Sequence, residues 1–186
     1  MKQPVVKILT LSAVFILTVA FNSPAIASGN RFNRSGGITV TAAPLSAGEI
    51  SYLTLMREEE KLARDVYLLF YEAWELPIFK NITASEQSHM DAVKMLLDKY
   101  GISDPALAPG EFTPQSGLQP LYDSLTAQGL ASIDGAYSAG VAIEEEDISD
   151  LQAAIAASTH QDIIRVYNNL LQGSLRHLAA FTSHQA

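Results

Sequence analysis

Apolar side chains recur every three or four residues along four long stretches of this sequence, and that spacing gathers them on one face of a helix. The predicted helices cover about residues 46–74, 81–100, 132–157 and 159–181. No run alternates with a period of two between turn residues, as a strand would. The pattern therefore predicts an all-α fold in which four helices bury their apolar faces against one another as a bundle.

Capping residues and a proline set the ends of the first two helices. Ser46 is a suitable N-cap, and Glu49 three residues later completes a capping box. Pro77 ends the first helix. The second helix is then expected to begin at Asn81 or Thr83.

A long connection separates the second helix from the third. Residues 102–116 are predicted to be irregular because their prolines exclude a long helix. A short helix is expected over 118–128, with Gly129 at its end. The whole connection is long for a link between antiparallel neighbours, and it suits a crossover from one end of a bundle to the other.

The N-terminus has the pattern of a secretory signal peptide. Lys2 and Lys7 form a charged start, residues 8–20 are nearly all apolar, and the run Ala25–Ala27 provides small residues before a cleavage point. The apolar run is shorter than the ~20 residues that span a bilayer, which argues against the alternative of a membrane anchor. We expect a signal peptide over 1–27, a flexible leader over 28–44, and a helical domain over 45–186 that acts in the periplasm or outside the cell.

Composition limits the chemistry of this domain. Acidic residues outnumber basic ones by 20 to 12, and the net charge of −8 argues against a nucleic-acid-binding protein, which would present a basic surface. The chain has no cysteine, so thiolate zinc sites, iron–sulfur clusters and disulfides are excluded. Any metal site must use histidine and carboxylate ligands.

Charged residues interrupt the apolar faces of all four long helices. Glu60 lies within the apolar stripe of the first helix, and Glu86-x-x-His89 puts a carboxylate and an imidazole on one face of the second. Glu144 lies on the apolar face of the third helix, and His177 on that of the fourth. Charged side chains are rarely buried unless they are paired or bind a metal. These five residues are therefore the primary candidate metal ligands.

Three further residues are secondary candidates, because the phase of a predicted helix is uncertain by a residue or two. Glu59 competes with Glu60 for the inward position, and Glu145 competes with Glu144. Asp147 lies three residues after Glu144 and shares its helix face.

Two structural alternatives compete with a metal site. The run from Thr83 to Glu86 also matches a capping box, which would make Glu86 a structural residue at a helix start. A metal-free bundle that interacts with a partner in the cell envelope would instead pair its acidic residues with Arg57, Lys61, Arg64 or Arg176.

Ligands supplied by four separate segments favour the metal centre. Several carboxylates in one core would repel one another and lose their hydration unless cations neutralised them. Carboxylate oxygen and imidazole nitrogen together suit iron or manganese. The sequence therefore predicts a centre of one or two such ions.

These motifs resemble the ferritin-like superfamily, in which one Glu from each of two helices and Glu-x-x-His from each of the other two bind two iron ions. More closely, the chain is similar to the DUF2202 family, distantly akin to rubrerythrins, over about residues 45–183. The runs that carry the similarity are Glu58–Tyr67, Ser85–His89, Ile143–Ile148 and Gly173–Leu178. The resemblance implies a ferritin-like four-helix bundle whose crossover contains a short extra helix. It also implies a di-iron centre that oxidises Fe(II) or reduces peroxide.

One position departs from the family plan. The last helix reads Ser174-x-x-His177, so the carboxylate of its motif is missing. Asp147 or water is the alternative ligand, or else the second metal site is weak. The chain also lacks the Cys-rich module that brings electrons to rubrerythrins. The resemblance thus supports metal binding more than catalysis, and it leaves an oxidoreductase, a metal store and a homodimer as open expectations.

Overall fold

The computed structural model describes residues 43–184, and every regular element within that range is a helix. The helices are α1 (Ala47–Trp74), α2 (Pro77–Tyr100), α3 (Gln119–Ala131), α4 (Ile133–Ala157) and α5 (Gln161–Thr182). The predicted all-α fold is confirmed. The expected signal peptide (1–27) and almost all of the leader (28–44) lie outside the described residues. Among the helices in the described range, none has the length and apolar character needed to cross a lipid bilayer.

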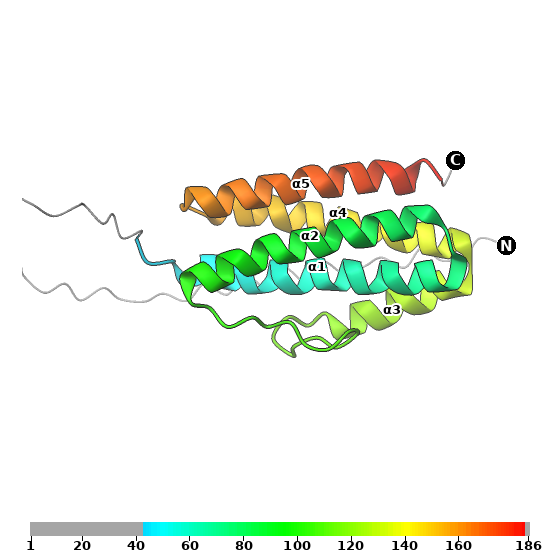
Figure 1. Ribbon diagram of the computed structural model, residues 1–186, viewed down its shortest axis with the longest axis horizontal. Coiled ribbons are helices and arrows are strands. Elements are labelled where there is room, and N and C mark those ends of the chain that lie inside the picture. The colour runs from blue at the N-terminus through cyan, green and yellow to red at the C-terminus, as the bar shows by residue number, and fades with distance from the viewer. Residues whose placement is uncertain (1–42, 185–186) are drawn as a thin grey trace, which may run out of the picture. The chain divides into compact units, whose positions relative to one another are not determined.

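The four long helices pack side by side as a bundle (Figure 1). α1 contacts α2 and α4, and α5 contacts the same two helices, so the four enclose a common interior. α3 lies outside this set, against α1 and α4 (Figure 1). An irregular segment, residues 101–118, connects α2 to α3.

The turn between α1 and α2 is shorter than predicted. Glu75 closes α1 with a φ of 53°, a left-handed conformation that few residues other than glycine adopt. Leu76 follows, and Pro77 is already the first residue of α2. Proline suits that position because its missing N–H would have had no partner there. The same proline therefore ends one helix and starts the next.

The predicted start of α2 at Asn81 or Thr83 is wrong for that reason. Thr83 lies inside α2, where its hydroxyl donates to the carbonyl of Phe79 at 2.8 Å. A residue in this position does not cap a helix. The capping-box interpretation of Glu86 is therefore excluded.

Gly129 lies inside α3 and does not end it, contrary to the prediction. A Cβ atom at this position would overlap the ring of Phe70 in α1. The carbonyl of Gly129 also accepts the indole N–H of Trp74 at 3.0 Å. Gly129 thus serves the close approach of α3 to α1.

The irregular segment is held against α1 by buried charged side chains. Glu58 accepts the backbone N–H of Thr113 at 2.7 Å, and Asp65 accepts that of Gly110 at 2.9 Å. Lys61 donates to Asp65 at 2.7 Å. One face of α1 therefore binds this segment, and another faces the interior of the bundle.

Buried apolar residues form two clusters at different heights along the bundle. The first cluster includes Tyr67, Phe79 and Phe181, and the second includes Leu53 and Tyr167. Along α1 the second cluster comes first and the first cluster follows. The space between the two clusters is filled by polar side chains.

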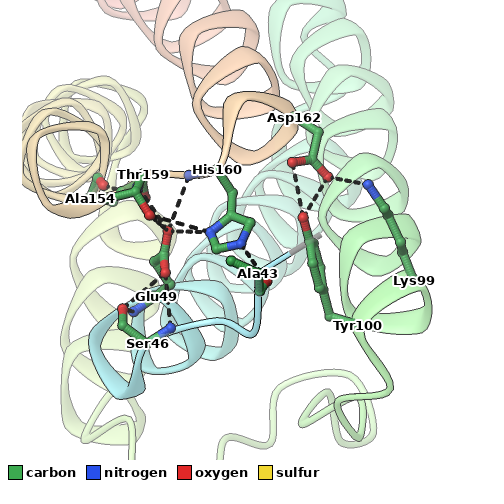
Figure 2. Close-up of polar contacts among 10 residues, drawn as sticks. Ala43, Ser46, Glu49, Lys99, Tyr100, Ala154, Thr159, His160 and Asp162 are labelled. Atoms are coloured by element: carbon green, nitrogen blue, oxygen red, sulfur yellow. Dashed lines mark hydrogen bonds and ion pairs between the residues drawn. The ribbon is translucent and has the colours of Figure 1, made fainter. Parts of the chain in front are cut away.

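Glu49 joins the start of α1 to the connection between α4 and α5 (Figure 2). Its Oε2 accepts the N–H of Ser46 at 2.9 Å, and the predicted capping box is confirmed. Its Oε1 accepts the N–H of Thr159 at 2.8 Å and lies 2.8 Å from Nδ1 of His160. The other ring nitrogen of His160 lies 2.8 Å from the carbonyl of Ala43. Both ring nitrogens face acceptors, which favours the charged imidazolium.

The Glu49–His160 pair makes the stability of the fold depend on pH. Burial raises the pKa of Glu49, but hydrogen bonds from His160, Thr159 and Ser46 outweigh it and hold that pKa well below 4.5. The Glu49 carboxylate raises the pKa of His160 above 6.5. The lowered pKa of Glu49 stabilises the fold above pH 4.5, and this stabilisation is lost as the pH falls through the pKa that Glu49 has in the folded protein. The raised pKa of His160 stabilises the fold below pH 6.5, and this stabilisation is lost as the pH rises through the pKa that His160 has in the folded protein.

We predict that Glu49→Gln lowers the free energy of unfolding by about 1–3 kcal/mol near pH 6, because it removes a buried charged acceptor that holds two elements together. The stability difference between wild type and His160→Gln should shrink as the pH rises above 6.5. Urea unfolding between pH 4 and pH 9 measures both effects. Asp98→Asn, which removes an exposed ion pair with Lys94, is the control and should change little. A Glu49→Gln variant that is as stable as wild type near pH 6 would contradict the role of Glu49 in joining the two elements.

Candidate metal centre

A layer of polar side chains lies between the two apolar clusters. Its members are Glu60 of α1, Glu86 and His89 of α2, Glu144 and Asp147 of α4, and Ser174 and His177 of α5. The three glutamates are each only 2% exposed. On α1, for example, Glu60 falls between Met56 of one cluster and Ala63 of the other. The fold therefore withdraws these carboxylates from water.

Glu60, Glu86 and His89 form one group in this layer. Nδ1 of His89 lies 2.7 Å from Oε2 of Glu86 and 3.1 Å from Oε2 of Glu60. Glu86 and His89 share a face of α2 because they are three residues apart, and Glu60 approaches from α1. The ligand atoms of the three residues lie close enough together to hold one metal ion.

Glu86, Glu144 and His177 form a second group. Nδ1 of His177 lies 2.8 Å from Oε1 of Glu86 and 3.6 Å from Oε2 of Glu144. The rings of His89 and His177 stack with their centroids 5.7 Å apart. Glu86 thus turns one oxygen toward the histidine of each group.

Several polar atoms in the layer are buried without a hydrogen-bond partner. They are Oε1 of Glu60, Oε1 of Glu86, Oδ1 of Asp147 and Nδ1 of His177. Nδ1 of His177 and Oε1 of Glu86 lie only 2.8 Å apart, yet they are not aligned as a hydrogen bond. Leaving a buried polar atom unpaired costs about 1–3 kcal/mol. Buried unpaired atoms on carboxylate and imidazole groups that lie close together are a donor set that fits a metal ion such as iron or manganese.

Lysine and arginine do not neutralise this layer. Arg57 pairs with Asp104 at 2.8 Å, Lys61 and Arg64 pair with Asp65 at 2.7 and 2.6 Å, and Arg176 is exposed. Among residues 43–184, the ion pairs made by the carboxylates of the layer are with histidine. Arg57, Lys61 and Arg64 thus pair with acidic residues, as the metal-free alternative predicted, but their partners in the described residues are Asp104 and Asp65 and not the carboxylates of the layer.

Burial and mutual repulsion alter the proton affinity of the layer. Burial raises the pKa of Glu60 well above its ordinary value, and Asp147 raises it further. Burial also raises the pKa of Glu86, but contacts with His177 and His89 outweigh it and lower this pKa to about 2. Burial lowers the pKa of both histidines, but the carboxylates beside them raise it to about 10 for His89 and about 9 for His177. Protons therefore provide the positive charge where no metal does.

Two residues outside the ligand set shape the layer. The hydroxyl of Tyr67 donates to Oε1 of Glu144 at 2.7 Å, from α1 to α4. A Cβ atom on Gly173 would lie 2.5 Å from the ring of His89, so this glycine allows α5 to approach α2. Both contacts join distant helices, and spacing within one helix does not reveal them. The small pair Gly173–Ser174 is the one sequence signal of a close helix approach.

The structure separates the secondary candidates. Of the two alternatives on α4, Glu145 is exposed and Glu144 is buried, so Glu144 takes the inward position; successive helical residues are rotated by about 100°. Glu59 is half-buried and lies against Asp150, outside both groups. Asp147 is 8% exposed and lies near Glu144 and Glu86, although it too is outside both groups. Metal binding by any of these residues stays a prediction.

Comparison with known proteins gives one family. A family model described as "Uncharacterized protein domain (DUF2202)" matches residues 49–185. The chain is 49% identical over 140 residues to the uncharacterized protein MJ0754 of Methanocaldococcus jannaschii, and the match covers 74% of this chain and 75% of that protein. It is also similar to the crystal structure of hypothetical protein MJ0754 from Methanococcus jannaschii DSM 2661. That likeness has a TM-score of 0.75 and 46% identity, and it covers 79% of this chain and 85% of the other.

We predict that Gly173→Ala lowers the free energy of unfolding by about 1–3 kcal/mol, because the added methyl group meets the ring of His89 and overpacking costs that much. Intrinsic helix preference acts in the opposite direction, since alanine is favoured over glycine by about 1 kcal/mol. Urea unfolding of the metal-free protein measures the net effect. Gly48→Ala is the control, because a Cβ atom there meets only Oγ of Ser46 at 3.9 Å.

The double variant Gly173→Ala/His89→Ala identifies the cause of that effect. It removes the ring that the added methyl group meets, so its loss of stability should be smaller than the sum of the two single losses. Strict additivity, or a Gly173→Ala protein more stable than wild type, would show that the two residues do not press on each other.

Proposed function

This chain belongs to the DUF2202 family, and from that premise we propose that it is an exported ferritin-like protein that binds two iron or manganese ions. The proposed ligands are Glu60, Glu86, His89, Glu144 and His177. The position of Glu86 carries the proposal. Its two oxygens face two different histidines, and each histidine has a second carboxylate beside it.

The donor atoms support iron or manganese. The layer offers carboxylate oxygen and imidazole nitrogen, and the chain has no thiolate. Hard oxygen donors with one imidazole for each ion suit Fe(II) and Mn(II) better than they suit Cu(I), which prefers sulfur.

The order of the elements supports a ferritin-like arrangement. α1 with α2 and α4 with α5 form two pairs of neighbouring helices, each joined by a short connection, and residues 101–118 and α3 lie between the pairs in the sequence. Glu60 and Glu144 come from the first helix of each pair, and His89 and His177 from the second. The di-iron carboxylate proteins share this distribution of ligands.

Bound iron would supply one electron per ion to oxygen or peroxide, so the activity that we propose is Fe(II) oxidation or peroxide reduction. The side chains of this protein hold and orient the centre. Tyr67 fixes one oxygen of Glu144 through its hydroxyl. The apolar clusters on either side keep water from the carboxylates. Export is proposed from the signal-peptide pattern of residues 1–27.

We predict that the mature protein, purified without chelator from cells supplied with iron and manganese, contains close to two metal ions per chain by elemental analysis. Glu86→Gln keeps the shape of the side chain but removes the charge that both groups share. This substitution should lower the affinity for both ions by at least about tenfold, which is 1.4 kcal/mol. Glu145→Gln changes the exposed neighbour of Glu144 in the same way and should leave the metal content unchanged.

The histidines distinguish the two groups. His89→Ala removes a ligand from the first group alone, and His177→Ala removes one from the second, so each should reduce the metal content without the uniform loss expected for Glu86→Gln. Retention of the full iron content by His89→Ala would count against the ligand set. A wild-type protein that binds no metal, and whose melting temperature does not respond to Fe(II) or Mn(II), would refute the function proposed here.

A further inference from the structure

We propose that Asp147 is a further ligand of the metal centre, supplied by α4 in place of the glutamate missing from α5, and that Ser174 is the residue that positions it. The inference rests on the proposed function and deepens it. It assigns a role to the position at which this chain departs from the Glu-x-x-His motif.

Asp147 and Ser174 meet where α4 packs against α5. Oγ of Ser174 lies 2.5 Å from Oδ2 of Asp147, and the two residues are 1% and 8% exposed. The carbonyl of Leu170 lies 3.1 Å from the same hydroxyl. A hydroxyl has one proton to donate, and the shorter contact with a charged acceptor is the stronger one. Ser174 therefore fixes one oxygen of Asp147.

The other oxygen of Asp147 is buried near the other charged groups of the layer. Oδ1 is buried and has no hydrogen-bond partner. Asp147 lies three residues after Glu144, on the same face of α4, and its charge acts on Glu60 of α1 and is itself affected by Glu86 of α2. A buried carboxylate oxygen without a partner is costly unless a cation compensates it. Asp147 thus has one oxygen held by serine and one buried oxygen without a protein partner, which is free to bind a metal ion.

The packing of α5 explains why the carboxylate comes from α4. Gly173 places the backbone of α5 so close to α2 that a Cβ atom there would lie 2.5 Å from the ring of His89. Ser174 is 1% exposed, and a glutamate in its place would put a longer side chain into the same enclosed space. A short aspartate from the opposite helix needs less room.

The charge of the layer supports the same assignment. With Asp147 included, the layer contains four buried carboxylates, those of Glu60, Glu86, Glu144 and Asp147. These four negative charges equal the charge of two divalent ions. Two neutral histidines would then complete the set, because metal-bound imidazole carries no charge of its own.

The test is titration of Mn(II) into metal-free protein, with free Mn(II) followed by its electron paramagnetic resonance signal. Wild type should bind two ions per chain. Asp147→Asn should lose one ion, or bind the weaker ion at least about tenfold less tightly. Ser174→Ala should lower the affinity for the same ion by about tenfold. Ser174→Thr keeps the hydroxyl and should bind that ion with the affinity of wild type.

Matched controls separate these effects from general damage. Glu146→Gln removes an exposed charge beside Asp147. Ser88→Ala removes an exposed helical hydroxyl that donates to the carbonyl of Ala84 at 3.0 Å. Both should bind Mn(II) as wild type does. The metal-free Asp147→Asn protein should be at least as stable as wild type in urea, because it removes a buried negative charge near like charges. A structural role for Asp147 would lower that stability instead.

The outcomes distinguish failure of this inference from failure of the proposed function. If wild type binds two ions and Asp147→Asn binds two with unchanged affinity, Asp147 is not a ligand, although the centre stands. If wild type binds no Mn(II) and no Fe(II), the centre itself is refuted and this inference with it. If Asp147→Asn does not fold, Ser174→Ala decides, since unchanged affinity in that variant would overturn the role of the serine.

Discussion

The rest of the bundle depends on one constraint, the burial of several carboxylates in a single layer. Their ion-pair partners are histidines, whereas the lysines and arginines near them pair with other acidic residues. Moving a carboxylate into a protein interior costs several kcal/mol even after the structure relaxes. The apolar clusters around Tyr67 and Leu53 hold the four helices together on either side of the layer, and they also keep water from the carboxylates of Glu60 and Glu86. The same packing that stabilises the bundle therefore makes its centre unfavourable for uncompensated charge. A bound cation resolves that conflict directly.

The other face of α1 shows that this chain neutralises buried acids differently where no metal is proposed. Asp65 receives Lys61, Arg64 and the backbone N–H of Gly110. Glu58 receives both the N–H and the hydroxyl of Thr113. These acids are as buried as Glu60, yet their oxygens have partners. In the layer, by contrast, one oxygen each of Glu60, Glu86 and Asp147 has no hydrogen-bond partner, and the ion pairs of its carboxylates are with histidine.

The sequence was sufficient for the helices and for the inward residues, because both follow from periodicity within one segment. Glu60, Glu86, His89, Glu144 and His177 all lie in the layer for that reason. Periodicity could not choose between Glu144 and Glu145, since one residue of phase error moves a side chain by about 100°. The start of α2 differs from the prediction because Pro77, which cannot continue α1, is also the first residue of α2. The contacts of Gly129 with Phe70 and of Gly173 with His89 depend on how helices meet. The small pair Gly173–Ser174 indicates a close approach, but it does not tell which helix or which residue is approached.

The departure at Ser174 illustrates the same limit in chemical terms. A ligand set is defined by where oxygen and nitrogen atoms lie, and the residue that delivers each atom can change if a neighbouring helix supplies it. The sequence of α5 has no carboxylate at the position of the motif. In the folded protein, however, its Ser174 hydroxyl holds the carboxylate of Asp147 from α4. Gly173 lets α5 approach His89 of α2, and Ser174 beside it contacts the shorter acid that α4 supplies. The Glu-x-x-His motif is incomplete on α5, but Asp147 of α4 can supply the carboxylate that this helix lacks.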